Sequence, residues 1–177
     1  MNSLWNCKNI YKAVFYATDA FGKSNPIYNP NKKSYTAHFT SVAFNSINYT
    51  SLDEVDKEFM ITVAILHDVI EDTSVTYKDL IREFGVKVAD AVQALSRNEK
   101  LPFNEQIPDC LNRIKSQPKE VAIVKMADRL YNIRERYAGW SKEQQNLYKK
   151  EAQVVCDELG FASENMREAL QQAINEY

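Results

Sequence analysis

The stretch "AILHDVIEDTSVTYKDLIREFG", residues 64–85, places a histidine and an aspartate directly after an apolar run. His67 and Asp68 are followed, about one helical turn later, by Glu71 and Asp72. Residues four positions apart share a helical face, so we expect each member of the first pair to lie over one member of the second. Charges are rarely buried without a partner, and a divalent cation is one such partner. The stretch therefore predicts a polar site at the end of a buried helix.

Helical spacing of apolar residues extends through the rest of the chain. Only 4 glycines and 5 prolines occur in 177 residues, and they fall between the periodic segments. No segment alternates convincingly in the manner of a strand, so we expect an all-α fold. A loop is expected at 22–34, and Pro102 and Pro108 are expected to bracket a polar connection. Helices are expected at 11–21, from 35 onward, and at 52–70, 77–84, 88–95, 119–137, 141–155 and 163–174.

Several helix ends carry local signals. Thr76, with Asp79 three residues later, is typical of an N-cap, and Gly85 can close the short helix that follows. Pro118 stands where a first-turn proline would begin the helix at 119–137. Ser141 stands where an N-cap would begin the next helix. These signals fix where we expect the helices to start and stop.

The composition fits one globular domain that covers residues 1–177. Hydrophobic residues make up 45% of the chain and charged residues 26%, with a net charge of −2 and both signs well spread. We therefore expect neither a nucleic-acid nor a membrane partner. Three cysteines without a CxxC pair argue against a zinc ribbon or a disulfide framework, and no signal segment is evident, so we expect a cytoplasmic protein. Nothing in the composition indicates an oligomeric state.

Two further side chains extend the polar site. Asp128 lies beside an apolar stripe in the helix expected at 119–137, and the only other histidine, His38, lies in "SYTAHFTSVAF". Two imidazoles and two carboxylates form a shell that suits Mn²⁺, Fe²⁺ or Zn²⁺ better than Ca²⁺. Such a cation polarises phosphoryl oxygens, and Glu71 can take a proton from the nucleophile, so metal-assisted hydrolysis of a phosphate ester is indicated. The expected ligands are His38, His67, Asp68 and Asp128.

Each of these residues also has a purely structural explanation. A lone His67 would more often be a hydrogen-bonded core histidine than a ligand. Asp128 alone would most simply pair with Lys125 or Arg129 on its own helix. His38 alone would be explained as a histidine at the edge of the core. Taken one by one, none of these residues indicates a metal site, and the motifs in which they stand decide between the two explanations.

Three stretches carry a resemblance to a known family: "HDVIEDT", "TYKDLIREFGVKVADAV" and "VKMADRLYNIRE". They resemble the HD-domain hydrolases of the RelA/SpoT type, especially the small stand-alone alarmone hydrolases akin to the metazoan SpoT homologue. The later stretch "GWSKEQQNLYKKEAQVV" is similar to the corresponding part of those small enzymes. The resemblance covers most of the chain and implies a single HD-domain helical bundle.

The resemblance also implies an activity and a set of roles. Members of the family remove the 3′-pyrophosphate from ppGpp, usually with Mn²⁺, and some small members act on other phosphorylated nucleotides. The implied metal ligands are His38, His67, Asp68 and Asp128, and the implied catalytic pair that positions or activates water is Glu71 and Asp72. The residues implied to contact the nucleotide are Asn132 and Tyr148, with Lys125, Lys32 and Lys33 as further candidates.

The chain departs from the family around the purine-binding motif. Phe21 stands where relatives carry a histidine, and the loop at 22–34 replaces the basic motif that holds the purine. Lys32 and Lys33 could replace it, or could equally be a solvated pair. Further departures are Ser34 and Phe39 in place of prolines and Gln144 in place of an arginine.

These departures keep two alternatives to ppGpp hydrolysis open. The same centre could act on a different nucleotide, such as NADPH, a 3′-phosphorylated nucleotide or a cyclic nucleotide. The chain could also be a catalytically silent protein that binds a nucleotide without turnover. The presence of all six centre residues favours activity over silent binding.

Overall fold

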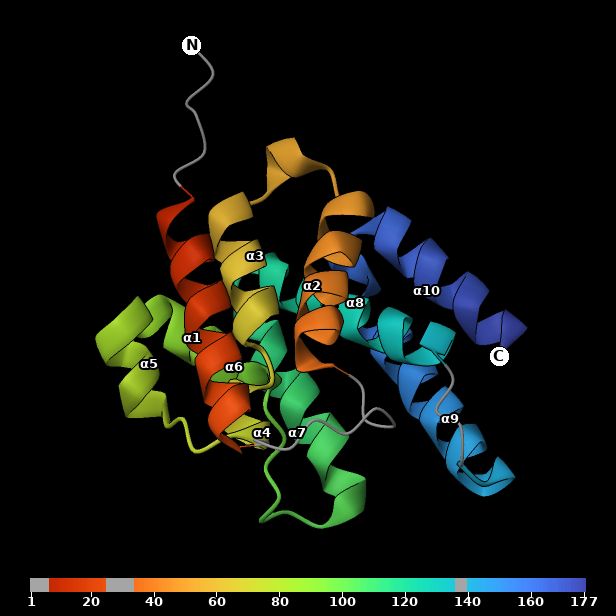
Figure 1. Ribbon diagram of the computed structural model, residues 1–177. Coiled ribbons are helices and arrows are strands. Elements are labelled where there is room, and N and C mark those ends of the chain that lie inside the picture. Colours follow the sequence, from red (N-terminus) through yellow and green to blue (C-terminus); the bar gives the residue numbers. More distant parts are fainter. Residues whose placement is uncertain (1–6, 25–33, 136–139) are drawn as a thin grey trace.

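The computed structural model describes residues 7–24, 34–135 and 140–177, and within these ranges the chain contains helices and no strand (Figure 1). The expected all-α fold is therefore confirmed. Short 3₁₀ turns occur at Leu52–Glu54 and Gly160–Ala162. The helices are α1 (Lys8–Ser24), α2 (Tyr35–Asn48), α3 (Lys57–Leu66), α4 (Val69–Asp72), α5 (Tyr77–Phe84), α6 (Val86–Leu95), α7 (Phe103–Lys115), α8 (Lys119–Glu135), α9 (Lys142–Leu159) and α10 (Glu164–Glu176).

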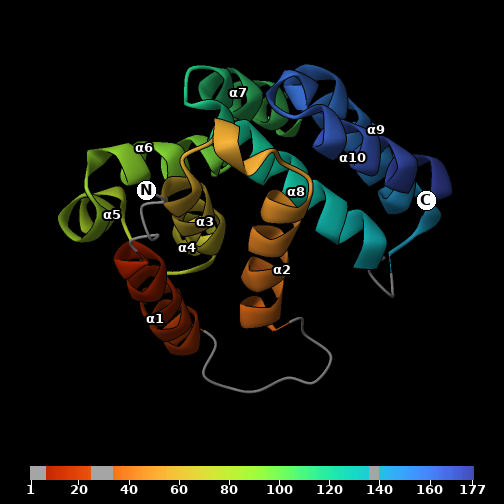
Figure 2. The ribbon, with the colours of Figure 1, turned by 90° about the horizontal axis from the view of Figure 1, so that it is seen from above.

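Helix α8 runs through the middle of the bundle. It contacts α2, α3, α6 and α7 as well as the α9–α10 pair, and Figure 2 shows it crossing between these groups. Helices α5 and α6 pack on each other on the side away from α9 and α10 (Figure 1). The buried apolar side chains of all these helices form one connected core. No helix in the described ranges combines the length and apolar character that a membrane span requires.

Helix α3 is buried almost all round. Every residue from 59 to 66 is buried, as the apolar run in the sequence predicts for a core helix. Asp56 begins the helix, because its carboxylate accepts a hydrogen bond from the Phe59 N–H at 3.1 Å. The helix ends at Leu66, so it carries His67 and Asp68 to the inner edge of the bundle.

The expectation of one helix over 52–70 is wrong, because the chain breaks at the His-Asp pair. Helix α3 ends at Leu66 and α4 begins at Val69. The His67 Nδ1–H donates to the Ala64 carbonyl at 2.7 Å. In an uninterrupted helix this carbonyl would accept from the Asp68 N–H, so the imidazole competes with the backbone and ends the helix.

The expected polar connection between Pro102 and Pro108 is also wrong. Pro108 lies inside α7, which begins directly after Pro102. Its ring removes one backbone donor, but four apolar side chains at helical spacing are buried against the core. Their burial outweighs the missing hydrogen bond, and they are Ile107, Cys110, Leu111 and Ile114.

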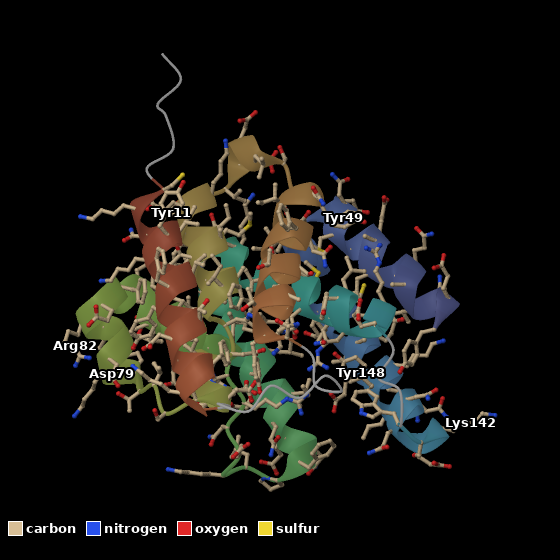
Figure 3. The ribbon with its side chains drawn as sticks, viewed as in Figure 1. Tyr11, Tyr49, Asp79, Arg82, Lys142 and Tyr148 are labelled. Atoms are coloured by element: carbon tan, nitrogen blue, oxygen red, sulfur yellow. The ribbon has the colours of Figure 1, made fainter. Side chains whose placement is uncertain are left out.

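The local signals at other helix ends are confirmed. Thr76 and Asp79 form a reciprocal capping box at the start of α5, and Asp79 also pairs with Arg82 at 2.9 Å near the outer surface (Figure 3). Ser141 and Gln144 form the same motif at the start of α9. Pro118 precedes α8, and its carbonyl accepts from the Val121 N–H at 3.0 Å. Short-range hydrogen bonds therefore fix these boundaries as the sequence predicts.

Gly85 is expected to be essential to the turn between α5 and α6. Its φ of 82° and ψ of 167° lie in a region that is open almost only to glycine, so Gly85→Ala should lower the free energy of unfolding by about 1–3 kcal/mol. Gly22, in α1, has open space around its Cβ position, so Gly22→Ala should leave stability unchanged or raise it by up to about 1 kcal/mol. Urea unfolding followed by circular dichroism measures both. Equal effects of the two substitutions would contradict the assignment.

Candidate metal and catalytic site

Four predicted ligands from separate elements converge at one point. His38 lies on α2, His67 and Asp68 lie between α3 and α4, and Asp128 lies on α8. The two histidine Nε2 atoms are 3.1 Å apart. Asp68 Oδ2 lies 3.1 Å from the His38 Nε2 and 3.0 Å from the His67 Nε2. Asp128 Oδ1 completes the group at 3.5 and 3.8 Å from the same two nitrogens.

The donor atoms of this cluster fit a divalent cation. Only 9% of His38, 4% of His67 and 7% of Asp128 is exposed, so the polar atoms are nearly withdrawn from bulk water. Because the Ala64 carbonyl can only accept, the His67 Nδ1 must carry a proton in its 2.7 Å hydrogen bond. A neutral His67 then directs the lone pair of its Nε2 into the cluster. A hydrogen bond from the other ring nitrogen to a backbone carbonyl is a usual second contact of a metal-binding histidine. Within the described residues, His38, His67 and Asp128 also satisfy the mutual distances that a common ligand requires.

The charges of the cluster shift the pKa values of its members. Burial lowers the pKa of His67, but the charge and hydrogen bond of Asp68 and the charge of Asp128 outweigh it and raise the pKa to about 9. Burial raises the pKa of Asp68, but the two histidines hold it well below its usual range. Without a cation, protonation of His67 therefore compensates part of the negative charge of the carboxylates.

Metal affinity is expected to increase with pH, because a cation must displace the proton on His67. In the metal-free protein, the protonated His67 stabilises the fold fully below pH 6.5, and this contribution is lost as the pH rises through about 9. The apparent affinity for Mn²⁺ should therefore rise by about tenfold per pH unit between about 7 and 9. Calorimetric titrations in buffers of different ionisation enthalpy should also detect the release of a proton. An affinity that does not change over this range would contradict the competition.

The predicted catalytic carboxylates lie beside the cluster. Burial, with the charges of Asp68 and Glu71, raises the pKa of Asp72 to about 6. Glu71 Oε1 accepts a hydrogen bond from the Arg97 backbone N–H at 2.7 Å. Glu71 also lines a cavity of about 580 Å³ together with Arg97 and Lys100. The two carboxylates thus lie near the predicted metal ligands, and Glu71 faces a space large enough for part of a ligand.

Asn132 and Lys125 contact the protein at defined places on α8. The Asn132 side-chain amide donates to Asp128 Oδ1 at 2.7 Å, so it orients a predicted metal ligand. Lys125 is buried, and its ammonium group donates to the Leu95 carbonyl at 3.3 Å, at the end of α6. Both residues were expected to contact the substrate, and that role stays a prediction.

Tyr148 lies on α9 (Figure 3) and packs against an aromatic and a cationic side chain. The centre of its ring is 4.7 Å from the Arg129 guanidinium carbon and 5.0 Å from the Trp140 ring, which it meets edge to face. Its predicted contact with substrate is not tested by these contacts. Lys32 and Lys33, the other expected substrate contacts, lie outside the described residues.

The departures from the family pattern have structural roles. Phe21 is buried and stacks on Tyr35 with ring centres 4.2 Å apart. Ser34 caps α2 by accepting from the Ala37 N–H at 3.4 Å. Gln144 completes the capping box of α9. Phe39 is buried in the core. The positions that depart from the family pattern thus serve packing or helix capping in this chain.

Several residues around the site were not predicted from the sequence. Tyr131 packs against His38, with ring centres 4.9 Å apart. The Glu151 carboxylate lies between the guanidinium groups of Arg97 and Arg129. These contacts join residues 22 or more positions apart in the sequence, so no local motif signals them. The only available signal was the position of Arg129 directly after Asp128.

An all-helical bundle in which two histidines and two carboxylates converge at a buried junction has the fold and site of a helical metal-dependent phosphohydrolase. Residues 13–162 match the HD domain family, and the chain belongs to this family. The expectation drawn from "HDVIEDT" and the later stretches is therefore confirmed.

Relatives and a solved structure agree with this assignment. A protein of Danio rerio named guanosine-3′,5′-bis(diphosphate) 3′-pyrophosphohydrolase MESH1 is 32% identical over 123 residues, which are 67% of this chain and 68% of that protein. The Escherichia coli bifunctional (p)ppGpp synthase/hydrolase SpoT is 38% identical over 77 residues, 40% of this chain and 11% of that protein. A solved structure of a metazoan ortholog of SpoT that hydrolyzes ppGpp covers 98% of each chain with a TM-score of 0.79 and 21% identity, which shows the shared fold.

Proposed function

We propose that this chain is a metal-dependent hydrolase that removes the 3′-pyrophosphate from ppGpp and releases GDP. The convergence of His38, His67, Asp68 and Asp128 at distances of 3.0 to 3.8 Å is the observation that carries this proposal. The name of the Danio rerio relative, which describes this reaction, supports the substrate. Mn²⁺ is the proposed cation, and Fe²⁺ or Zn²⁺ would suit the same mixed nitrogen and oxygen donors.

The proposed roles follow from the contacts of each side chain. A bound divalent cation would polarise phosphoryl oxygens and favour the formation of hydroxide from water. The imidazole Nε2 atoms and the carboxylates of Asp68 and Asp128 would hold it, with Asn132 fixing the orientation of Asp128. Glu71 and Asp72 would orient water and accept its proton. The pKa of Asp72, about 6, leaves this carboxylate mostly ionised at neutral pH, as a general base requires.

The substrate would reach the centre through the cavity beside Glu71. Its volume, about 580 Å³, falls in the range of small-molecule sites. Its lining is charged, with the basic residues Arg97, Lys100 and Arg113 beside the acidic residues Glu71, Glu99 and Asp109. Tyr148, Lys125, Lys32 and Lys33 remain proposed as further contacts with the nucleotide. We propose the Glu71 side of the cluster as the place where the phosphate groups lie.

We further propose that residues 1–177 act as one HD domain in the cytoplasm. The described helices share one apolar core, which supports a single folding unit. Cys7, Cys110 and Cys156 are free thiols, as proteins of a reducing compartment usually have. A small-molecule nucleotide is the proposed partner.

A second substrate class is favoured by the region that replaces the purine motif. Phe21 is buried against Tyr35 instead of presenting a polar side chain. The same centre could then accept a nucleotide with a different base or phosphate arrangement. NADPH, 3′-phosphorylated nucleotides and cyclic nucleotides are the candidates of this class.

Turnover by the metal-stripped protein, with and without added Mn²⁺, tests these proposals. The substrates are ppGpp, NADPH, GTP, 3′-phosphorylated nucleotides and cyclic dinucleotides, and released phosphate or pyrophosphate is measured. Conversion of ppGpp to GDP and pyrophosphate only with Mn²⁺ is the expected result. Turnover of another nucleotide alone would overturn the substrate and keep the centre, whereas tight binding without any turnover would establish the silent binding protein.

A further inference from the structure

Glu151 on α9 holds two arginines from different parts of the fold. Its Oε2 lies 3.1 Å from the Arg97 guanidinium and 3.6 Å from that of Arg129. The side chains of Glu151 and Arg129 are only 13% and 3% exposed, so these charges are largely withdrawn from water. A carboxylate between two guanidinium groups in such surroundings has little freedom to move. Glu151 therefore ties the segment after α6 to α8 and α9.

Arg97 is the residue whose backbone contacts the predicted catalytic carboxylate. Its N–H donates to Glu71 Oε1 at 2.7 Å, while its guanidinium donates to Glu151. Arg113 helps to hold the preceding residue, because its guanidinium donates to the Ser96 carbonyl at 2.7 Å. The direction of the Arg97 N–H thus depends on Glu151 and Arg113, whose side chains hold residues 96 and 97 in place.

The second arginine connects the same carboxylate to the metal cluster. Arg129 directly follows Asp128 on α8, and its guanidinium packs on the Tyr148 ring. One Glu151 oxygen thus contacts the helix that carries Asp128 and the segment that orients Glu71. Glu151 can therefore fix the position of the Glu71 carboxylate relative to Asp128.

We propose that Glu151 is a positioning residue of the active site: through Arg97 it holds the N–H that orients the Glu71 carboxylate, and through Arg129 it keeps that segment in register with Asp128. The inference rests on the proposed hydrolase function. It adds a fifth carboxylate to Asp68, Asp128, Glu71 and Asp72, one that touches neither substrate nor metal.

Glu151→Gln tests the proposal, because the amide keeps the size of the side chain and removes its charge. We expect kcat to fall by about 10- to 100-fold with KM little changed, the range found for outer-shell partners of functional groups. In a Glu71→Gln background the same change should have little further effect, because both act through one carboxylate. Glu158→Gln is the matched control, since Glu158 lies on the same helix and pairs with Lys115 at the surface. It should leave kcat unchanged.

Amide hydrogen exchange, followed by NMR, supplies a readout that does not need activity. In Glu151→Gln the Arg97 amide should exchange at least about tenfold faster. The Ser96 amide, which donates to the Val92 carbonyl at 3.1 Å, should keep its protection and so shows that α6 is still folded.

The outcomes separate this proposal from the proposed function. If the unsubstituted protein turns over no nucleotide, the hydrolase function fails, and exchange at Arg97 still decides whether Glu151 holds this segment. An unchanged exchange rate at Arg97 in Glu151→Gln would overturn the proposal. An unchanged kcat in an active enzyme, or additive losses in the double variant, would overturn it equally.

Discussion

Asp68→Asn is expected to lower the affinity for Mn²⁺ by more than about a hundredfold and to abolish measurable turnover. Mutation of residues that only support metal ligands already lowers metal affinity or activity by about 10- to 100-fold. Asp68 is itself a predicted ligand, and its Oδ2 lies 3.1 and 3.0 Å from the Nε2 atoms of His38 and His67. The amide retains the shape of the carboxylate but loses its charge. The pKa of His67 should also fall, since Asp68 contributes most to raising it.

Three measurements check this expectation: Mn²⁺ titration, turnover of ppGpp and NMR titration of His67. Asp90→Asn is the matched control, because Asp90, on α6, is likewise an aspartate with a defined partner, the Tyr77 hydroxyl at 2.6 Å. The control should keep metal affinity and turnover. Full metal affinity in folded Asp68→Asn would show that the cation is held without this carboxylate and would remove Asp68 from the ligands.

Much of the fold was predictable because its determinants are local. Helical spacing of apolar residues and capping pairs such as Thr76 with Asp79 act within one or two turns, so the sequence displays them directly. The break after α3 was not predictable in this way. It depends on the hydrogen bond from the His67 imidazole to the Ala64 carbonyl, while the other ring nitrogen contacts His38 and Asp68 from distant or adjacent parts of the chain. At α7, burial of one face overrides the breaking tendency of Pro108, which only tertiary packing decides.

The candidate site was also predictable only in part. His67, Asp68 and Asp128 stand in short motifs, and His38 was added because a mixed ligand set of this kind needs a second imidazole. The contact from Arg97 to Glu71 spans 26 residues of sequence, and the contact from Arg97 to Glu151 spans 54. Nothing in the local sequence of these residues indicates such partners. The predicted ligands were therefore visible in the sequence, whereas the groups that contact the predicted catalytic carboxylate were not.

Glu71→Gln is expected to lower kcat by about 10²- to 10⁴-fold while metal affinity changes by less than a few fold. The predicted role of Glu71 is to take a proton from water, and positioned general bases contribute about this much to a rate. In the present protein the Glu71 carboxylate accepts a hydrogen bond from the Arg97 N–H at 2.7 Å. The side-chain oxygen of a glutamine can accept the same hydrogen bond, so the position of the side chain should be kept. Only the ability to accept a proton is removed.

Side-by-side measurement of kcat and Mn²⁺ affinity distinguishes this role from that of a ligand. Asp68→Asn should lose both properties, whereas Glu71→Gln should lose only the first. Glu164→Gln serves as the control, since Glu164 is exposed on α10 and pairs with Arg167. A Glu71→Gln protein with normal kcat would remove Glu71 from the proton transfer and leave Asp72 as the carboxylate that accepts the proton. Loss of the metal together with kcat would instead place Glu71 among the ligands.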